Sequence, residues 1–113
     1  MKIVDKISLG EVKEMAEKMF GDLVKADVDI VKKVVIIDME MHVDGEQELL
    51  ENGSKQNDLW GINLKPEFYG TEKFIEFDSM INIRPSQNNP SRDVLDENVR
   101  AKIKEIIEQV VYE

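Results

Sequence analysis

The chain has 113 residues, with 24 acidic against 15 basic side chains and a formal net charge of −9. This length predicts one domain over residues 1–113, and a hydrophobic content of 42% predicts that it folds. There is no cysteine, so disulfide scaffolds, thiolate nucleophiles and cysteine-based metal sites are excluded. The acidic balance makes nucleic acid a poor partner, and the lack of a long apolar stretch predicts no membrane association and a cytoplasmic location.

The first predicted element is a helix over residues 8–20. Ser8 and Glu11 have the spacing of a capping box, in which the two residues satisfy each other's free backbone N–H groups. Apolar residues then recur at helical spacing, and Gly21 can end the helix in a left-handed conformation. We therefore expect this helix to pack one apolar face on a core.

Two stretches of alternating apolar and polar residues follow, and they predict a β-hairpin. The first stretch covers residues 24–30 and the second covers residues 35–43, with a turn near residues 31–33. On the second stretch, one predicted face is apolar and the other becomes polar toward its end. The apolar face is made by Val35, Ile37, Met39, Met41 and Val43.

The second half of the chain contains the remaining predicted elements. They are a short helix from Asp44 to a stop at Asn52-Gly53, strands over residues 59–64 and 74–84, a loop over residues 85–93, and a final helix after an Asp96 cap. Too few residues separate the strands for regular parallel crossovers. We therefore expect an α+β fold, in which the N-terminal, C-terminal and short helices pack on one face of an antiparallel sheet of about four strands.

Acidic residues and the one histidine of the chain alternate on the second and fourth predicted strands. Side chains two positions apart share a face of a strand, so five titratable groups are expected on one side of the sheet. They are Asp38, Glu40, His42, Glu76 and Asp78. Crowded carboxylates can bind Mg²⁺ or Ca²⁺, or divide acid and base roles between them. The alternative is an ordinary solvent-facing sheet surface, because no recognised metal-binding spacing is present.

A second candidate site is rich in arginine and amide side chains. All three arginines of the chain lie between residues 84 and 100, whereas the lysines are spread elsewhere. A guanidinium group suits carboxylate or phosphate, and the neighbouring amides add donors and acceptors. The predicted ligand-binding residues are Arg84, Gln87, Asn88, Asn89, Arg92 and Arg100. The alternative is a loop of ordinary turn residues whose arginines form structural ion pairs.

Three stretches of the sequence, ENGSKQ at residues 51–56, LWGINL at 59–64 and FIEFDSMINIRP at 74–85, are familiar. They resemble a family of short prokaryotic proteins known only as a domain of unknown function. The resemblance covers the whole chain, including residues 1–8 and 86–89. It implies a stand-alone domain of this length, and it implies no activity, cofactor or catalytic residue.

Three classes of function remain open from the sequence. The leading hypothesis is a non-enzymatic binding module, a homo-oligomer such as a dimer, whose arginine-rich loop binds a small anionic ligand or a protein partner. The second is a metal-assisted hydrolase or acid/base enzyme that uses the five titratable groups and no cofactor beyond a divalent cation. The third is a regulatory protein whose acidic surface meets a basic partner.

Overall fold

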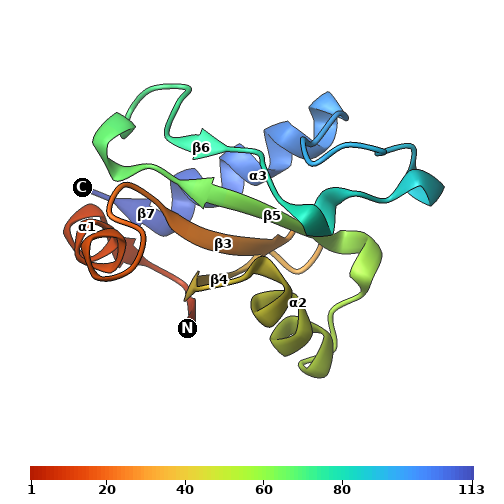
Figure 1. The fold of residues 1–113 in the computed structure, drawn as a ribbon, viewed down its shortest axis with the longest axis horizontal. Coiled ribbons are helices and arrows are strands. Elements are labelled where there is room, and N and C mark those ends of the chain that lie inside the picture. Colours follow the sequence, from red (N-terminus) through yellow and green to blue (C-terminus); the bar gives the residue numbers. More distant parts are fainter.

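The computed structural model describes residues 1–113 and contains a five-stranded sheet between helices (Figure 1). The strand order is β1-β4-β3-β5-β6, and every pairing in this sheet is antiparallel. The strands are β1 (Lys2–Val4), β3 (Val24–Asp29), β4 (Val34–Met39), β5 (Leu59–Leu64) and β6 (Ile75–Glu76). The predicted α+β class and antiparallel sheet are thus confirmed.

A separate pair of strands joins the two ends of the chain. β2 (Ile7–Ser8) runs parallel to β7 (Val111–Tyr112), directly after the last helix. Neither this pair nor β1 was predicted, because each is only two or three residues long. Strands of that length do not show a period-two pattern.

The three α-helices are α1 (Leu9–Lys18), α2 (His42–Glu51) and α3 (Glu97–Val110). The predicted Asp96 cap is confirmed, and of the predicted Ser8–Glu11 capping box the half made by the Ser8 hydroxyl is confirmed. The hydroxyl of Ser8 accepts a hydrogen bond from the N–H of Glu11, and the carboxylate of Asp96 accepts from Asn98 and Val99. None of the helices combines the length and the apolar composition needed to cross a membrane.

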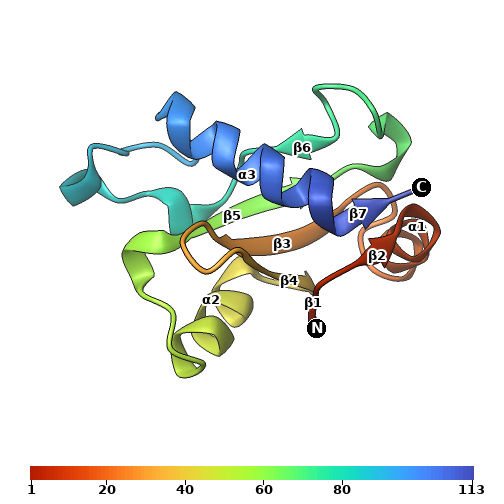
Figure 2. The ribbon, with the colours of Figure 1, turned by 180° about the vertical axis from the view of Figure 1, so that it is seen from behind.

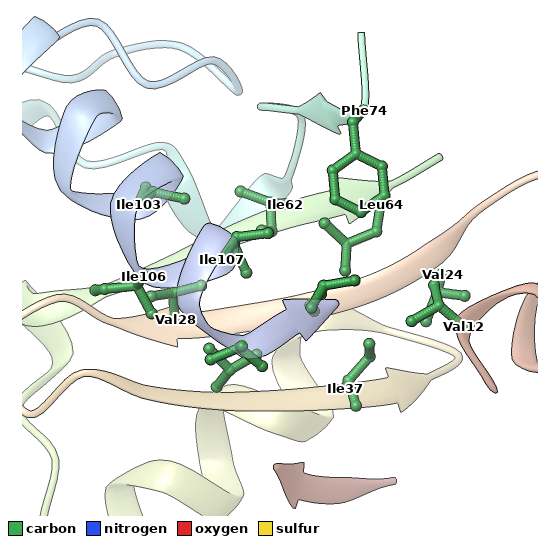
Figure 3. Packing of buried hydrophobic residues seen from close by; sticks show 14 of the residues in the cluster. Val12, Val24, Val28, Ile37, Ile62, Leu64, Phe74, Ile103, Ile106 and Ile107 are labelled. Atoms are coloured by element: carbon green, nitrogen blue, oxygen red, sulfur yellow. The ribbon is translucent and has the colours of Figure 1, made fainter. Parts of the chain in front are cut away.

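Most of the apolar core lies between the sheet and the helices α1 and α3 (Figure 2). It contains 21 buried hydrophobic residues, so it is the main source of stability of the fold. Figure 3 shows Ile62 of β5 next to Ile107 of α3, and Leu64 of β5 next to Phe74. We call this side of the sheet the α3 face.

Helix α2 covers the opposite side of the sheet, which we call the α2 face (Figure 1). The prediction that all helices pack on one face is therefore wrong for α2. Its apolar contacts come from a cluster of four buried residues, Ile36, Met39, Leu49 and Leu59. The central strands are consequently buried on both faces, although their alternation predicted one solvent-exposed face.

The predicted strand over residues 35–43 ends early because β4 contains a bulge. The pairing of β3 with β4 shifts register after Ile37, and Asp38 has a positive φ of 76°. As a result Ile37 points to the α3 face, whereas Met39 joins the cluster on the α2 face. The chain then bends, and α2 begins at His42, two residues before the predicted start at Asp44.

The predicted fourth strand over residues 74–84 is extended only at β6. Ser79 begins a short 3-10 turn over Met80–Asn82, where its hydroxyl accepts a hydrogen bond from the N–H of Ile81. The Asn82 side chain then bonds both the N–H and the C=O of Gly61 on β5, at 2.8 and 2.9 Å. A side-chain amide thus takes the place that a longer β6 would have had.

Candidate functional site

The five titratable groups of the first predicted site do not gather. β4 and β6 are separated by β3 and β5, and three strand spacings amount to about 14 Å. Asp38 lies near the N-terminus and α1, and Glu40 is exposed in the bend before α2. No group of three or more His, Asp or Glu side chains in the structure could hold a metal ion. The convergence that the metal-site prediction required is therefore absent.

The remaining acids of that prediction are each paired with a cation. Glu76 lies 3.0 Å from Lys65 and accepts a hydrogen bond of 2.8 Å from Asn63. Asp78 lies 2.6 Å from the Nε of Arg92. Of the five residues of this predicted site, only His42 and Asp78 line the same cavity.

The three arginines likewise have separate partners. Arg84 is buried, stacks on Trp60 with 4.0 Å between its guanidinium carbon and the ring centre, and donates to the carbonyls of Gln56 and Leu59. Arg100 binds Asp93 at 2.8 Å. Only Arg92 lines the cavity that His42 and Asp78 share. The arginines do not converge on one pocket, and Arg84 serves the fold.

The amide side chains of the predicted loop also hold backbone rather than an open site. Asn89 donates to the carbonyls of Asn82, Ser91 and Asp93 and accepts from the N–H of Leu95. Gln87 donates to the carbonyl of Asn57. Asn88 is exposed and left-handed, with a φ of 59°. Asn89 and Gln87 therefore hold the backbone of the loop and of Asn57 in place.

A cavity of about 150 Å³ lies where the start of α2 meets β5 and the segment after β6. We call it the α2 cavity. Its polar lining comes from Lys25, His42, Asn63, Asp78, Ser79 and Arg92, and apolar residues at its wall are Met41, Val43, Met80 and Ile81. The cavity therefore joins members of both predicted sites in a place that neither prediction named.

Gly61 allows this arrangement because it has no side chain. A Cβ at this position would lie 2.6 Å from the Ser79 hydroxyl and 3.1 Å from the imidazole of His42. Both contacts are too short for any residue but glycine without displacement of a neighbour. The glycine in the middle of β5 thus lets Ser79 and His42 approach the sheet directly.

His42 is neutral at neutral pH and its orientation is fixed. Its Nε2 lies 2.8 Å from the carbonyl of Ile62, and since a carbonyl only accepts, Nε2 carries the proton and donates. Burial lowers the pKa of His42, and the charge of Lys25 lowers it further. The Ile62 carbonyl, the charge of Asp78 and the neighbouring side chain of Asn63 oppose this shift. Its Nδ1 has no protein partner and is not sealed from solvent, so this nitrogen presents a lone pair.

The α2 cavity is positively charged within an acidic protein. Lys25 and Arg92 oppose the single carboxylate of Asp78 in its lining. Helix α2 also begins there without a side-chain cap, and the backbone N–H groups of His42 and Val43 donate to no protein acceptor. Free N–H groups at a helix start favour a negative ligand.

One buried atom of the cavity lining also lacks a partner. Asn63 is 5% exposed, and its amide nitrogen donates to Glu76 and to the carbonyl of Asp78. Its Oδ1 has no hydrogen bond in the protein. This oxygen and the Nδ1 of His42 are acceptors, so the lining combines positive charge with two places for a donor.

A buried acid lies under the next turn of α2. Asp27 of β3 is fully buried, and neither of its carboxyl oxygens has a hydrogen-bond partner. Burial and the nearby carboxylates of Glu46 and Asp44 raise the pKa of Asp27 to about 9. The backbone N–H of Glu46 lies close to the carboxyl group, although outside hydrogen-bonding geometry, and offsets only part of the rise. Asp27 is therefore a neutral carboxylic acid at neutral pH.

Glu46 on α2 adds a second perturbed acid. Burial raises its pKa, whereas the charge of Arg84 and the side chain of Gln56 oppose the rise. One of its oxygens is buried without a partner. The α2 face thus holds two carboxyl groups that each have at least one buried oxygen without a hydrogen-bond partner.

Two other cavities are less suited to bind a charged ligand. The larger, of about 570 Å³, lies between α3 and the turn before β6, and its charged lining is Lys104 against Glu72 and Glu108. The other, near the N-terminus, balances cations and acids. Neither contains a histidine or a group whose pKa is shifted.

The sequence did not identify Lys25, Asp27, Glu46, Asn63 or Asn82 as site or scaffold residues. Lys25, Asp27 and Asp29 alternate with apolar residues, which is the usual pattern of a strand with one solvent-facing side. The predicted short helix was the one sequence signal that these residues are covered. A helix at that place must pack on one face of the sheet and bury the side chains there.

The sequence model of the family described as "Protein of unknown function (DUF5674)" matches residues 1–110. No curated protein matches the chain. No solved structure matches it either. The family match covers nearly the whole chain and agrees with the resemblance of the stretches at residues 51–56, 59–64 and 74–85. The chain belongs to this family of unknown function.

Proposed function

We propose that this protein is a small-ligand binding module that takes an anionic group, a carboxylate or a phosphate, in the α2 cavity. The observation that carries the proposal is a net positive cavity at an uncapped helix start in a chain with a net charge of −9. The anionic ligand class is the one expected from the sequence. Its place moves from the loop of residues 84–100 to the α2 cavity, which retains Arg92.

The chemistry of the lining supports a specific arrangement of the ligand. An anionic oxygen lies toward Lys25 and the N–H groups of His42 and Val43, where charge-assisted hydrogen bonds are strongest. A hydroxyl or N–H group of the same ligand faces the two acceptors, Asn63 Oδ1 and His42 Nδ1. The apolar wall excludes water from one side, which strengthens these contacts.

Titration with inorganic phosphate and with acetate, followed by amide NMR spectra, tests this proposal. We expect the largest shifts at the amides of His42 and Val43. Lys25→Gln is expected to weaken binding about tenfold, since one charge-assisted contact contributes about 1.4 kcal/mol or more. Lys104→Gln, which removes a cation from the large cavity, is the matched control and leaves the affinity unchanged.

The proposal fails if neither anion shifts the His42 and Val43 amides, or if Lys25→Gln and Lys104→Gln weaken binding equally. In the second case the anion responds to the overall charge of the protein and not to this cavity. Self-association stays a prediction, because the structure contains one chain. Sedimentation velocity at high protein concentration tests it, and a strict monomer contradicts it.

Acid/base chemistry is the second candidate, and the state of His42 favours it. A neutral imidazole with a fixed tautomer and an open Nδ1 can accept a proton from a bound ligand. This candidate retains His42 and Asp78 from the predicted acid/base set and needs no metal. Two results together support this candidate. Phosphate shifts the amide NMR spectra, and the protein hydrolyses members of a panel of esters and anhydrides, an activity that is lost in His42→Gln. Binding that persists in His42→Gln without any turnover favours the binding module.

A further inference from the structure

Helix α2 packs on a much smaller apolar cluster than α3. This cluster has four buried members, Leu49 of the helix and Ile36, Met39 and Leu59 beneath it, whereas the core that α3 shares with α1 and the sheet has 21. The partly buried Val34 packs against this cluster, and the polar Asp27 also lies beneath the helix. Elements with few apolar contacts open at lower free energy than the molecule as a whole.

The carboxyl group of Asp27 lies directly against the backbone of α2. A Cβ placed on Gly45 would lie 2.4 Å from Asp27 Oδ2 and 2.7 Å from the sulfur of Met39. Glycine is thus the residue that lets the helix come down onto the acid. The acid in turn is fully buried by the helix, without a hydrogen bond to either oxygen.

We propose that α2 is a proton-locked lid over the α2 face: it closes on the neutral form of Asp27 and lifts when that carboxyl group ionises. The position of Asp27 under α2 defines a closed and a lifted state of the helix. In the closed state a helix that holds few apolar contacts seals an unpaired carboxyl group. In the lifted state water solvates the carboxylate, which removes the cost of burying a charge.

The charged groups around Asp27 favour this response. From α2 it faces Glu46 and Asp44, both acidic. Its partners across the sheet, Ile36 of β4 and Gly61 of β5, are uncharged. No cation pairs with Asp27, and the charge of Arg84 acts on Glu46. On β3 itself, Lys25 and Asp29 lie two residues away on the same face, and Lys25 lines the α2 cavity. An ionised Asp27 under a closed helix would therefore be repelled by the acids of α2.

The lid regulates the α2 cavity, and this part rests on the proposed function. Met41, His42 and Val43 line the cavity and belong to the start of α2, so lifting the helix removes one wall. A ligand that needs this wall binds only the closed state and holds the lid down by linkage. Ligand affinity is expected to fall as the pH rises toward the alkaline range.

Hydrogen exchange of the α2 amides tests the lid without any ligand. Above about pH 7, where His42 is neutral in both states, lifting the helix releases one proton from Asp27, so the opening constant rises about tenfold per pH unit. The intrinsic exchange rate rises by about the same factor, and the α2 amides should exchange about a hundredfold faster per pH unit. They should also exchange faster than the slowest amides of β3, which report global unfolding.

Asp27→Asn is expected to reduce this dependence to about tenfold per pH unit, since the amide does not titrate. Asp27→Leu is a second variant of similar size, should the first fail to fold. Glu51→Gln makes the same acid-to-amide change on the exposed side of α2 and keeps the steep dependence. The lid is overturned if the wild-type dependence is only tenfold, if it stays steep without Asp27, or if α2 exchanges no faster than β3.

Phosphate separates failure of the lid from failure of the cavity. If both hold, phosphate at about pH 7 slows exchange of the α2 amides in proportion to occupancy. A steep pH dependence that phosphate does not affect overturns the regulation of the cavity and leaves the lid. Phosphate shifts at His42 without a steep pH dependence leave the proposed binding site and overturn the lid.

Discussion

The two faces of the sheet are built from the same strands but by opposite means. On the α3 face, residues such as Val28, Ile62 and Ile107 form a continuous apolar core. On the α2 face, buried polar groups outnumber the apolar residues of a four-member cluster, and they include Asp27, His42, Glu46 and Asn63. The α3 face supplies most of the stability, so the α2 face can hold groups that are costly to bury.

The largest expected effect comes from shortening a side chain in the core on the α3 face. Ile107→Ala should lower the free energy of unfolding by about 3 kcal/mol, because Ile107 is 1% exposed in the middle of the core. Chemical denaturation measures the loss. Leu95→Ala, at a residue 51% exposed, is the control and should change stability by less than about 1 kcal/mol. Similar losses in both variants would contradict the placement of the core.

The next effect concerns the amide that closes the edge of β5. Asn82→Ala removes two hydrogen bonds to Gly61 and one to the carbonyl of Arg92, and Asn82 is fully buried. We expect a loss of about 2 to 3 kcal/mol, since the backbone groups of Gly61 remain buried without partners. Asn98→Ala makes the same change at an exposed helix position and should be nearly neutral. A neutral Asn82→Ala would show that a strand or solvent replaces the amide.

The pH dependence of the free energy of unfolding reports on the buried acid of the α2 face. The pKa of Asp27 is raised from 3.8 to about 9, so the folded state holds a proton that the unfolded state releases. This contribution to stability is complete below about pH 4 and is lost as the pH rises through about 9. Between about pH 7 and pH 9 the wild type should lose about 2 kcal/mol relative to Asp27→Asn. Parallel denaturation curves for the two proteins over this range would contradict the burial of a neutral acid.

His42 acts in the opposite direction and at lower pH. Its pKa is lowered by burial, so its contribution to stability is present above the ordinary value of 6.5 and is lost as the pH falls. The measurement on Asp27 therefore belongs above about pH 7, where His42 does not titrate in either state.

The last prediction compares two glycines that both lie inside helices, and the smaller of its two effects is the smallest of the series. Gly10→Ala in α1 meets nothing closer than 3.9 Å and should stabilise the protein by up to about 1 kcal/mol. Gly45→Ala in α2 meets Asp27 at 2.4 Å and should destabilise it by about 1 to 3 kcal/mol. Thermal denaturation of both variants gives the sign of each change. Stabilisation by both substitutions would mean that α2 does not press on Asp27.

The sequence predicted the elements that carry a long periodic pattern. The helix after Ser8, the final helix after Asp96 and the strands β3 and β5 lie where alternation or helical spacing placed them. The pattern failed where a single residue changes the geometry. The bulge at Asp38 turns Met39 to the other face, and Ser79 and Asn82 replace the predicted fourth strand by a 3-10 turn. Such residues act through backbone conformation and long-range hydrogen bonds, which period counting does not detect.

The candidate site could be predicted only by residue type. His42, Asp78 and Arg92 were singled out, yet they were placed in two different sites, because their meeting depends on α2 crossing the sheet toward β5. Arg84 and Asn89 were also singled out, but Arg84 holds the backbone at the start of β5 and Asn89 holds the backbone of the loop. Asp27 looked like a surface residue because alternation shows which residues share a face and not what covers that face.

Native-state hydrogen exchange at about pH 7 with increasing denaturant tests the contrast between the two faces most directly. We predict that the amides at the end of α2 exchange through a local opening that denaturant hardly affects, at least about 2 kcal/mol below the global unfolding that exposes Ile103 and Ile107 of α3. If the α2 and α3 amides instead share one opening free energy and one denaturant dependence, the two faces are a single cooperative unit. A lightly held α2 would then be contradicted.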